Sequence, residues 1–425
     1  MKLIKYPSPD TWKQLLQRPA IDNTSLLQKV KAVMNEVRQQ GDVAVKQFTQ
    51  QFDGVELDNV VASAKEISES EALLSDELKQ AIRQAAANVT LFHEKQVAAV
   101  EVVETMPGVK CWRKSVGIEK VGLYIPGGTA PLFSTILMLG IPAKIAGCKE
   151  VVLCSPPDKE GKLHPAILFA AQLVGITKIC KIGGVQAIAA MAYGTATVPQ
   201  VSKIFGPGNQ YVTCAKQLVQ QDGIAIDMPA GPSEVCVLAD ESANAAFIAA
   251  DLLSQAEHGV DSQVVLVTTS ALLIDAVQEE LQKQLAVLPR KNLAEKALEN
   301  STLILVNSME EGISLVNEYA AEHLIIACNG DEDIAEKISN AGSVFLGNYS
   351  PESAGDYASG TNHTLPTNGF AKAYSGVSVD SFVKKITYQK LSKQGLQHIG
   401  KTVMLMADAE GLTAHANAVN IRIEK

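Results

Sequence analysis

The feature that most restricts the fold of this chain is a regular alternation of short apolar runs and helical segments that begins near residue 118. The runs VGLYI (121–125) and VVLCS (151–155) are almost entirely apolar, and each is followed by a segment with helical spacing. Strands that are apolar on both faces and separated by helices are typical of a parallel sheet covered on both sides. The sequence therefore predicts an α/β fold.

The same alternation starts again after residue 233, which predicts a second α/β unit. Its expected strands are VCVLAD (235–240), QVVLVTT (263–269), TLILV (302–306), HLIIA (323–327) and SVFLG (343–347). We expect the first unit to comprise residues 118–233 and the second to comprise residues 234–372.

Both ends of the chain are expected to be mainly helical. Apolar residues recur at three- and four-residue spacing over 25–40 and 76–95, and we expect residues 1–117 to pack on the second unit. Residues 373–425 are polar and carry too little apolar surface for a core of their own. We expect this helical tail to dock on the body of the protein or on a partner subunit.

Composition argues against several classes of function. The net charge is −9 with no basic run, and only 5% of the residues are aromatic, which disfavours binding to nucleic acids or anionic membranes. No apolar run reaches the roughly 18 residues of a membrane span, and the N-terminus lacks the apolar core of a signal peptide. The seven cysteines are scattered without a CxxC motif, as expected of reduced thiols. These features predict a cytoplasmic protein.

Three glycine-rich turns follow expected strands of the first unit: IPGGTAP (125–131), IGGVQA (182–187) and FGPGNQ (205–210). Ligands of open parallel sheets bind at the carboxyl ends of strands, where glycine lets backbone N–H groups approach a phosphate. The turns therefore favour a phosphate-bearing ligand, although tight βα connections are the alternative. Neither the GxGxxG fingerprint nor the GxxxxGK[ST] motif is present.

Two short segments place histidine beside other polar groups. In SQAEHG (254–259), Gln255 and His258 share a helix face and can aim at one cation, or His258 can simply interact with the helix dipole. In NEYAAEHLII (317–326), Glu322 and His323 precede an apolar strand and are common proton-transfer groups. An extended backbone points them to opposite faces, which predicts separate tasks. A solvent-exposed pair is the alternative.

A third polar segment, YSPESAGDYASGTNHTLPTNG (349–369), is predicted to be a site loop because long loops in compact domains are usually functional or disordered. It contains Asp356 and His363. Near the C-terminus, GLTAHANAV (411–419) contains His415, five residues after Glu410, for which a surface position is the alternative. Together the imidazoles, the carboxylate and the amide suit Zn²⁺ or a similar divalent ion.

Several long segments are similar to the histidinol dehydrogenase family: VGLYIPGGTAPLFSTILMLGIPAKIAG, KIFGPGNQYVT, IDMPAGPSEV, DLLSQAEHG, NEYAAEHL, GSVFLGNYSPESAGDYASGTNHTLPT and GLTAH. The resemblance implies two incomplete Rossmann-like domains with smaller helical parts. It also implies a homodimer whose active sites take residues from both subunits. The implied reaction is the four-electron oxidation of L-histidinol to L-histidine through enzyme-held L-histidinal, with two NAD⁺ consumed and one zinc ion bound per subunit.

Carried over by position, the resemblance assigns a role to each candidate residue. The implied zinc ligands are Gln255, His258, Asp356 and the partner's His415. His323 is implied as the base that takes the hydroxyl proton in each oxidation, and Glu322 as the base that activates water for attack on the aldehyde. The substrate is expected to touch Ser233, His363 and Glu410 as well as the zinc ligands and His323. NAD⁺ is expected to touch Tyr124, Gln186 and Asn209 at the glycine-rich turns.

Two positions depart from the family pattern. Ala321 stands where proline is usual, which loosens the backbone before Glu322, and Gly411 stands where a larger residue is common, which is expected to weaken a helix. Three other functions remain open. A dehydrogenase for another alcohol would keep most of these residues. A metal-dependent hydrolase would not need the three glycine-rich turns, and a nucleotide-binding module without activity would leave Glu322 and His323 unused.

Overall fold

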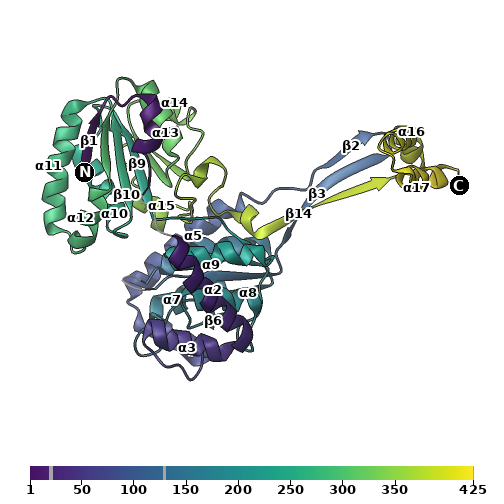
Figure 1. The fold of residues 1–425 in the computed structure, drawn as a ribbon, viewed down its shortest axis with the longest axis horizontal. Coiled ribbons are helices and arrows are strands. Elements are labelled where there is room, and N and C mark those ends of the chain that lie inside the picture. Colours follow the sequence, from purple (N-terminus) through teal and green to yellow (C-terminus); the bar gives the residue numbers. More distant parts are fainter. Residues whose placement is uncertain (19–22, 128–130, 425) are drawn as a thin grey trace.

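The computed structural model describes residues 1–18, 23–127 and 131–424, and it shows two α/β units from which a long arm extends (Figure 1). The first unit has a five-stranded sheet in which all neighbouring strands are parallel. In spatial order its strands are β6 (Lys178–Cys180), β5 (Glu150–Cys154), β4 (Lys120–Tyr124), β7 (Lys203–Phe205) and β8 (Ala225–Ile226). The chain leaves β4 toward β5 and later returns to the other side of β4, as in doubly wound sheets.

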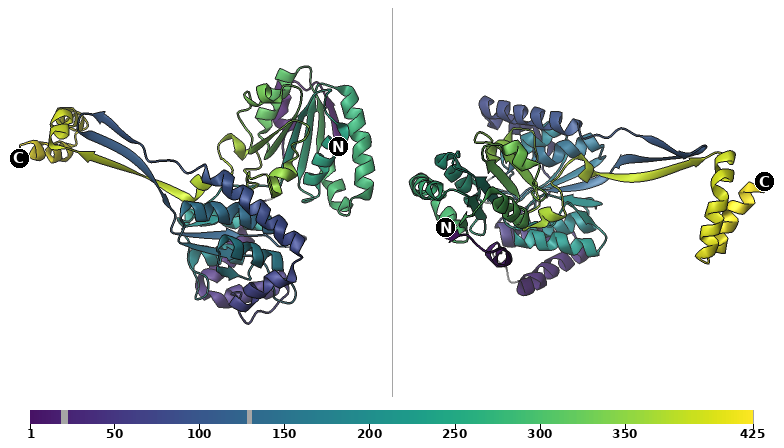
Figure 2. Two further views of the ribbon diagram at one scale, coloured as in Figure 1. Left: turned by 180° about the vertical axis from the view of Figure 1, so that it is seen from behind. Right: turned by 90° about the horizontal axis from the view of Figure 1, so that it is seen from above.

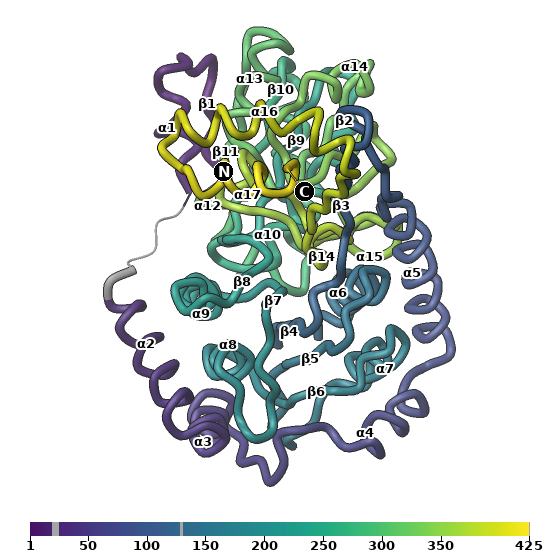
Figure 3. The backbone as a smooth tube through the Cα atoms, turned by 90° about the vertical axis from the view of Figure 1, so that its right-hand side faces the viewer, coloured from purple at the N-terminus to yellow at the C-terminus, as the bar shows by residue number. Residues whose placement is uncertain are grey.

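Helices cover both faces of this sheet because its strands are apolar on both sides. Figure 3 shows α8 and α9 on one side of the strands and α6 and α7 on the other. One hydrophobic cluster involves α2 (Asn23–Gln40), α3 (Asp42–Asp53), α8 (Gly184–Tyr193) and α9 (Gln210–Gln221). The opposite cluster involves α4 (Ala64–Glu69), α5 (Asp76–Glu94), α6 (Phe133–Ala146) and α7 (Pro165–Val174).

The second unit has a six-stranded sheet, again with parallel neighbours throughout. In spatial order its strands are β1 (Lys2–Lys5), β11 (Thr302–Leu305), β10 (Gln263–Thr268), β9 (Glu234–Ala239), β12 (His323–Ala327) and β13 (Ser343–Leu346). One face packs against α10 (Ala245–Ala256), α11 (Ala271–Val287) and α12 (Lys291–Glu299). The other packs against α1 (Trp12–Leu15), α13 (Met309–Tyr319) and α14 (Asp331–Ala335).

The arm is an antiparallel sheet capped by two helices. Its strands are β2 (Val102–Met106), β3 (Val109–Gly117) and β14 (Val383–Leu391), and its helices are α16 (Lys393–Ala409) and α17 (Thr413–Ile423). In both views of Figure 2 the arm carries the C-terminus away from the two units. Leu405 and Met406 in α16 are 61% and 62% exposed, so the tip of the arm leaves apolar side chains in water.

The structure confirms an α/β fold with two parallel-sheet units and helical additions, but three details of the prediction were wrong. Residues 383–391 form β14 and not a helix. Their polar sequence does not predict a strand, but pairing with β3 along nine residues stabilises one. Residues 1–117 do not pack as a block on the second unit. β1 joins the second sheet, whereas α2, α3 and α5 pack on the first unit.

The third error concerns Gly411. It lies between α16 and α17 with a φ of +74°, outside either helix, so glycine suits the turn that it occupies. Within the described residues, no helix combines the length and apolar character needed to cross a bilayer. All seven cysteines are free thiols, and four of them are buried.

Candidate active site

The predicted catalytic residues lie where the two units meet. His323 is the first residue of β12 and Glu322 precedes it, so both stand at the amino end of a strand in the second sheet. Thr135, in the first turn of α6, follows the carboxyl end of β4 in the first sheet. Its Oγ1 is 3.0 Å from Nε2 of His363 in the second unit. The carboxyl edge of the first sheet therefore faces the amino edge of the second, and the candidate site lies between them.

Glu322 and His323 lie close together, although their position in an extended chain predicted opposite directions. Oε2 of Glu322 is 3.6 Å from Nδ1 of His323. Glu322 lies just before the first paired residue of β12, and its carboxylate accepts the main-chain N–H of Glu234 at 2.9 Å. The N–H of Glu234 thus holds Glu322 while its carbonyl oxygen lies beside His323, so the two side-chain ends meet and the expected separation was wrong. Both side chains are buried.

Glu234, the first residue of β9, connects three predicted site residues through its main chain. Its N–H donates to Glu322, as above. Its carbonyl oxygen lies 3.3 Å from Nε2 of Gln255 and 3.2 Å from Nδ1 of His323. Nε2 of Gln255 is in turn 2.9 Å from Nδ1 of His323. The start of β9 therefore fixes the positions of both proposed bases and of one proposed metal ligand.

Asp356 lies in α15 (Glu352–Tyr357), a short helix inside the segment predicted as a loop, and it is surrounded by histidines. Its Oδ1 is 3.3 Å from Nε2 of His323, and its carbonyl oxygen is 2.8 Å from Nδ1 of His363. Burial by itself raises the pKa of Asp356, but His323, His363 and His258 outweigh that effect and bring the pKa below its usual value. Asp356 is therefore ionised, as a metal ligand has to be.

Burial and neighbouring carboxylates set the protonation of the two proposed bases. Removal from water raises the pKa of Glu322 to about 8. Burial by itself lowers the pKa of His323, but the surrounding carboxylates, chiefly Glu322 and Asp356, outweigh it and raise the pKa to about 10. A positive charge among these carboxylates would offset their effect and favour the neutral imidazole that a base needs.

Three of the four predicted zinc ligands lie in this cluster. Oε1 of Gln255 and Oδ1 of Asp356 are buried and find no hydrogen-bond partner among the described residues, which is costly unless a ligand satisfies them. The pKa of His258 is lowered, mainly by burial, although Asp356 raises it, and the neutral ring is the form that binds metals. These donors fit a zinc ion, and they are a mixture of amide, imidazole and carboxylate.

The fourth predicted ligand is not in this cluster. His415 lies in α17 and Glu410 ends α16, and both are exposed at the tip of the arm, remote from the two units (Figure 1). Over the described ranges, with gaps at 19–22 and 128–130, no three His, Cys, Asp or Glu side chains form a metal-binding group within one chain. The predicted zinc ligands agree with this, because the cluster of one chain holds only two of them that are His, Cys, Asp or Glu: His258 and Asp356.

Two predicted substrate contacts lie beside the cluster. Ser233 directly precedes Glu234 and is half-buried. His363 is held between the carbonyl oxygen of Asp356 and the hydroxyl of Thr135, and burial lowers its pKa. The cluster and these two residues border one region between the units.

The three residues expected to touch NAD⁺ lie at the carboxyl edge of the first sheet. The hydroxyl of Tyr124 accepts the N–H of Gly184 at 3.0 Å. Gln186 is fully buried in α8, and neither polar atom of its amide has a hydrogen-bond partner in the described ranges of the chain. Asn209 caps α9 by accepting the N–H groups of Tyr211 and Val212, so it also has a structural task. Residues 128–130 of the first glycine-rich turn lie outside the described residues.

A buried ion pair holds the third glycine-rich turn. Nζ of Lys216 is 2.5 Å from Oδ1 of Asp227 and donates to the carbonyl oxygen of Gly206 at 2.7 Å. Oδ2 of Asp227 accepts the N–H of Gly206 at 2.8 Å. Gly206 has a φ of +122°, and a Cβ there would lie 2.0 Å from the carbonyl oxygen of Tyr124. The turn therefore requires glycine and is fixed on both sides.

Four polar residues at the site were not predicted. Glu234 stands in the quoted segment IDMPAGPSEV, where a carboxylate directly before an apolar strand could have drawn attention. Glu352 is buried, accepts a hydrogen bond from Ser254 at 2.6 Å, and has a pKa raised by burial to about 7. Thr135 and Arg18 carry no signal in the sequence, because their contacts join residues more than 200 positions apart.

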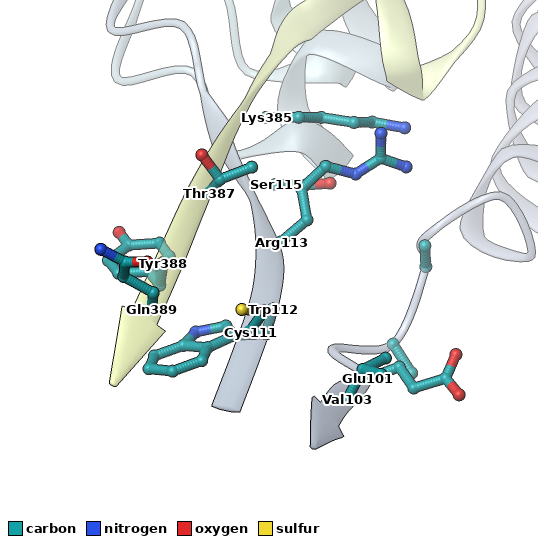
Figure 4. Close-up of a pocket in the computed structure, with 12 residues that line it drawn as sticks. Glu101, Val103, Cys111, Trp112, Arg113, Ser115, Lys385, Thr387, Tyr388 and Gln389 are labelled. Carbon is teal, nitrogen blue, oxygen red and sulfur yellow. The ribbon is translucent and has the colours of Figure 1, made fainter. Parts of the chain in front are cut away.

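A hollow on the arm lies apart from the candidate site (Figure 4). Strands β3 and β14 contribute the stacked rings of Trp112 and Tyr388 together with the cationic side chains of Arg113 and Lys385. Residues of the segment 98–103 line its opposite side. None of the predicted catalytic, metal or cofactor residues lines this hollow.

Comparison with known proteins gives one consistent family. The sequence profile of the histidinol dehydrogenase family matches residues 16–423. A histidinol dehydrogenase from Bacteroides thetaiotaomicron is 62% identical over 423 residues, covering 100% of this chain and 99% of that protein. One from Yersinia pestis is 52% identical over 98% of this chain and 94% of its own length. The crystal structure of histidinol dehydrogenase from Elizabethkingia anophelis superposes with a TM-score of 0.98 at 53% identity, covering 100% of this chain and 98% of that one.

Proposed function

The chain belongs to the histidinol dehydrogenase family, and we propose on that premise that it oxidises L-histidinol to L-histidine, the last oxidation of histidine biosynthesis, in the cytoplasm. The alcohol is oxidised to histidinal, which stays bound, takes up water and is oxidised to the acid. Each oxidation delivers one hydride to NAD⁺ and releases one proton, and ionisation of the product acid releases a third.

The observation that carries this proposal is the buried cluster of Glu322, His323, Gln255 and Asp356 between the two sheets. It contains two groups able to move protons and unpartnered oxygen atoms suited to a metal. It also stands opposite the edge at which Tyr124 and Gln186 lie. A hydrolase would use the cluster but would have no need of that second edge.

His323 is proposed as the base for the hydroxyl proton in both oxidations. Its Nδ1 lies 3.2 Å from the carbonyl oxygen of Glu234, to which an Nδ1–H can donate. In that tautomer the lone pair is on Nε2, which lies 3.3 Å from Oδ1 of Asp356. Within the part of the chain that the structure describes, Nε2 makes no hydrogen bond. This is the ring nitrogen that we expect to take the substrate proton.

Glu322 is proposed as the base that activates water for attack on histidinal. One carboxylate oxygen is fixed by Glu234, so the other is free to accept a proton from water. Burial raises the pKa of Glu322 to about 8, and a carboxylate with a raised pKa is a stronger base once it is ionised. Glu322 would therefore act in the second oxidation only.

Gln255, His258 and Asp356 would hold one zinc ion, completed by the partner's His415. When bound, zinc would fix and orient the substrate through the imidazole and amino nitrogens that histidinol offers. Ser233, His363 and Glu410 of the partner subunit would contribute further contacts to the substrate. Tyr124, Gln186 and Asn209 would contact NAD⁺ at the carboxyl edge of the first sheet.

We propose a homodimer in which the arm of each chain reaches the site of the other. Exposure of His415 and Glu410 on an arm directed away from its own body supports this arrangement. The exposed apolar residues of α16, Leu405 and Met406, support it as well, because a second copy can cover them. Residues 118–233 and 234–372 supply most of the two proposed units, but Phe382 stacks on Phe205 in the core of the first unit. We therefore propose that the part of 373–425 that serves the partner is α16 and α17.

The test is NADH production from L-histidinol followed to completion. Two NADH per histidinol, lost after chelation and restored by zinc, is the expected result. One NADH per substrate would limit the enzyme to a simple alcohol oxidation. No NADH from folded, zinc-loaded protein would contradict the proposed substrate.

A further inference from the structure

Arg18, whose side chain is 14% exposed, makes a double contact with the buried carboxylate of Glu234. Its Nε and Nη2 each donate to a carboxylate oxygen of Glu234 at 2.9 Å. Oε1 of Glu234 also accepts the main-chain N–H of Asn368 at 2.8 Å. Because the guanidinium is a rigid planar donor, this fork restrains both the position and the plane of the Glu234 carboxylate.

The same guanidinium also holds the segment that leads to the proposed bases. Nη2 donates to the carbonyl oxygen of Tyr319 at 2.7 Å, and the guanidinium carbon lies 4.0 Å from the centre of the Tyr319 ring. Tyr319 ends α13, three residues before Glu322. Arg18 therefore joins the start of β9 to the chain that presents Glu322 and His323.

Stability alone is a weak reason for such a pair. Desolvating two charges offsets most of their attraction, so a buried ion pair is often no more stabilising than apolar residues of similar size. What the pair does is fix geometry. The N–H and carbonyl groups of Glu234, on either side of the carboxylate that Arg18 grips, are the ones that hold Glu322 and His323.

We propose that Arg18 and Glu234 are a positioning pair that sets the orientation of Glu322 and His323 for the two oxidations. Neither residue touches the reacting atoms in this arrangement. The inference rests on the proposed function for its kinetic consequence, but the geometry of His323 can be measured without any substrate.

The first experiment replaces Arg18 with Met, which keeps most of the side-chain volume and removes all donors. We expect kcat for histidinal oxidation, per folded protein, to fall about tenfold or more, since small misplacements of a catalytic group are costly. The alcohol step should fall less, because Glu322 acts only on the aldehyde. KM for histidinol should change less than about threefold. Arg18→Lys, which can restore a single contact, should recover part of the loss.

Arg83→Met is the matched control. Arg83, on α5 and away from the site, also contacts a carboxylate and a ring: it pairs with Glu71 at 2.6 Å and lies 5.2 Å from the ring centre of Phe169, but this pair is exposed. It should leave the ratio of the two half-reactions unchanged. The double variant Arg18→Met with Glu234→Gln should show a smaller fold-loss in kcat than the product of the two single-variant losses. The reason is that the two residues act as one unit.

The second readout is the ¹⁵N signal of the His323 ring, assigned with His323→Gln. It should move in Arg18→Met and stay in place in Arg83→Met. An unchanged ring signal together with an unchanged ratio of half-reactions would overturn the positioning role. If Arg18→Met does not fold, the ratio of the two half-reactions and the ¹⁵N signal of His323 are measured in Arg18→Lys instead. Absence of histidinol oxidation by the unaltered protein would contradict the proposed function instead, while the ring signal would still decide the role of Arg18.

Discussion

Oε2 of Glu322 accepts the main-chain N–H of Glu234 at 2.9 Å, so one oxygen of this buried carboxylate is committed to holding its position. The carboxylate of Glu322 is thereby tied to the start of β9, and the same oxygen lies 3.6 Å from Nδ1 of His323. A substitution that keeps an oxygen at this place can remove the basic group without removing the hydrogen bond. This makes the role of Glu322 accessible to a clean test.

Glu322→Gln should slow the conversion of histidinal to histidine by about a hundredfold or more, the usual contribution of a general base. The conversion of histidinol to histidinal should change far less, because no water is activated there. Rates of NADH formation from histidinal and from histidinol in single turnovers measure the two halves. Equal losses in both halves would contradict the proposed activation of water.

His323→Ala and His415→Ala chains, each inactive alone, should regain activity when mixed and reassociated. A mixed dimer keeps one site that has both the intact His323 of one chain and the intact His415 of the other. Tagged subunits allow the mixed dimer to be purified before the assay. Lack of recovery in a verified mixed dimer would count against the shared site.

Zinc should bind to the chelated protein with one ion per subunit and raise its thermal midpoint, because a ligand that binds only the folded state stabilises it. Asp356→Asn should abolish most of this rise, since it removes the ionised oxygen ligand. Calorimetric titration gives the stoichiometry without reference to activity. Lys149→Met, at an exposed pair on the first unit, serves as the control. A full zinc response in Asp356→Asn would exclude this residue as a ligand.

Lys216→Met should destabilise the fold by about 3–5 kcal/mol, the usual cost of leaving a buried charge without its partner. It should also raise KM for NAD⁺, because the turn at Gly206 leads directly to Asn209. Urea unfolding and NAD⁺ kinetics measure the two effects. Lys149→Met, whose partner Glu119 is exposed, should cost less than about 1 kcal/mol. Loss of stability with an unchanged KM would separate this ion pair from NAD⁺ binding.

Asp53→Asn should stabilise the protein at pH 8 and have little effect near pH 4. Burial raises the pKa of Asp53 to about 6, and its Oδ2 has no hydrogen-bond partner among the residues that the structure describes. A carboxyl whose folded pKa lies above its unfolded value contributes stability below about pH 4 that is lost as the pH rises through 6. Because Asp53 is partly exposed, we expect a gain of about 1 kcal/mol at pH 8. Urea unfolding at several pH values tests this, and a gain independent of pH would contradict it.

The alternation of apolar runs and helices predicted the two parallel sheets because both faces of each strand are buried. The same reasoning could not find β14. That strand contains three lysines and a glutamine, two of which, Lys385 and Gln389, line the hollow of the arm. Only its pairing with β3 makes it a strand. Nor could it find that α2 packs on the first unit while β1 belongs to the second sheet, because packing partners depend on the path of the chain in space.

The candidate site shows the same division. Spacing on a helix and adjacency in sequence were enough to bring Gln255, Glu322 and His323 forward as candidates. The relative orientation of Glu322 and His323 was predicted incorrectly. The turn before β12 and the N–H of Glu234 decide where the Glu322 carboxylate points. Arg18 could not be found at all, since nothing near it in sequence marks a partner 216 residues away.

The pairing of β1 with β11 has a consequence for the order in which the protein can assemble. Lys2 is paired with Thr302, so the first strand to be synthesised receives its neighbour only after most of the chain has left the ribosome. During that interval the first unit can complete its own sheet and helices. β1 has only four residues with a lysine at each end, so it is a poor template for pairing with a wrong strand. This protects the growing chain from mispairing until β11 has been made. Because β12 and β13 follow β11 in the chain, the second sheet is completed at the edge opposite β1, where β13 is the last of its strands to be made.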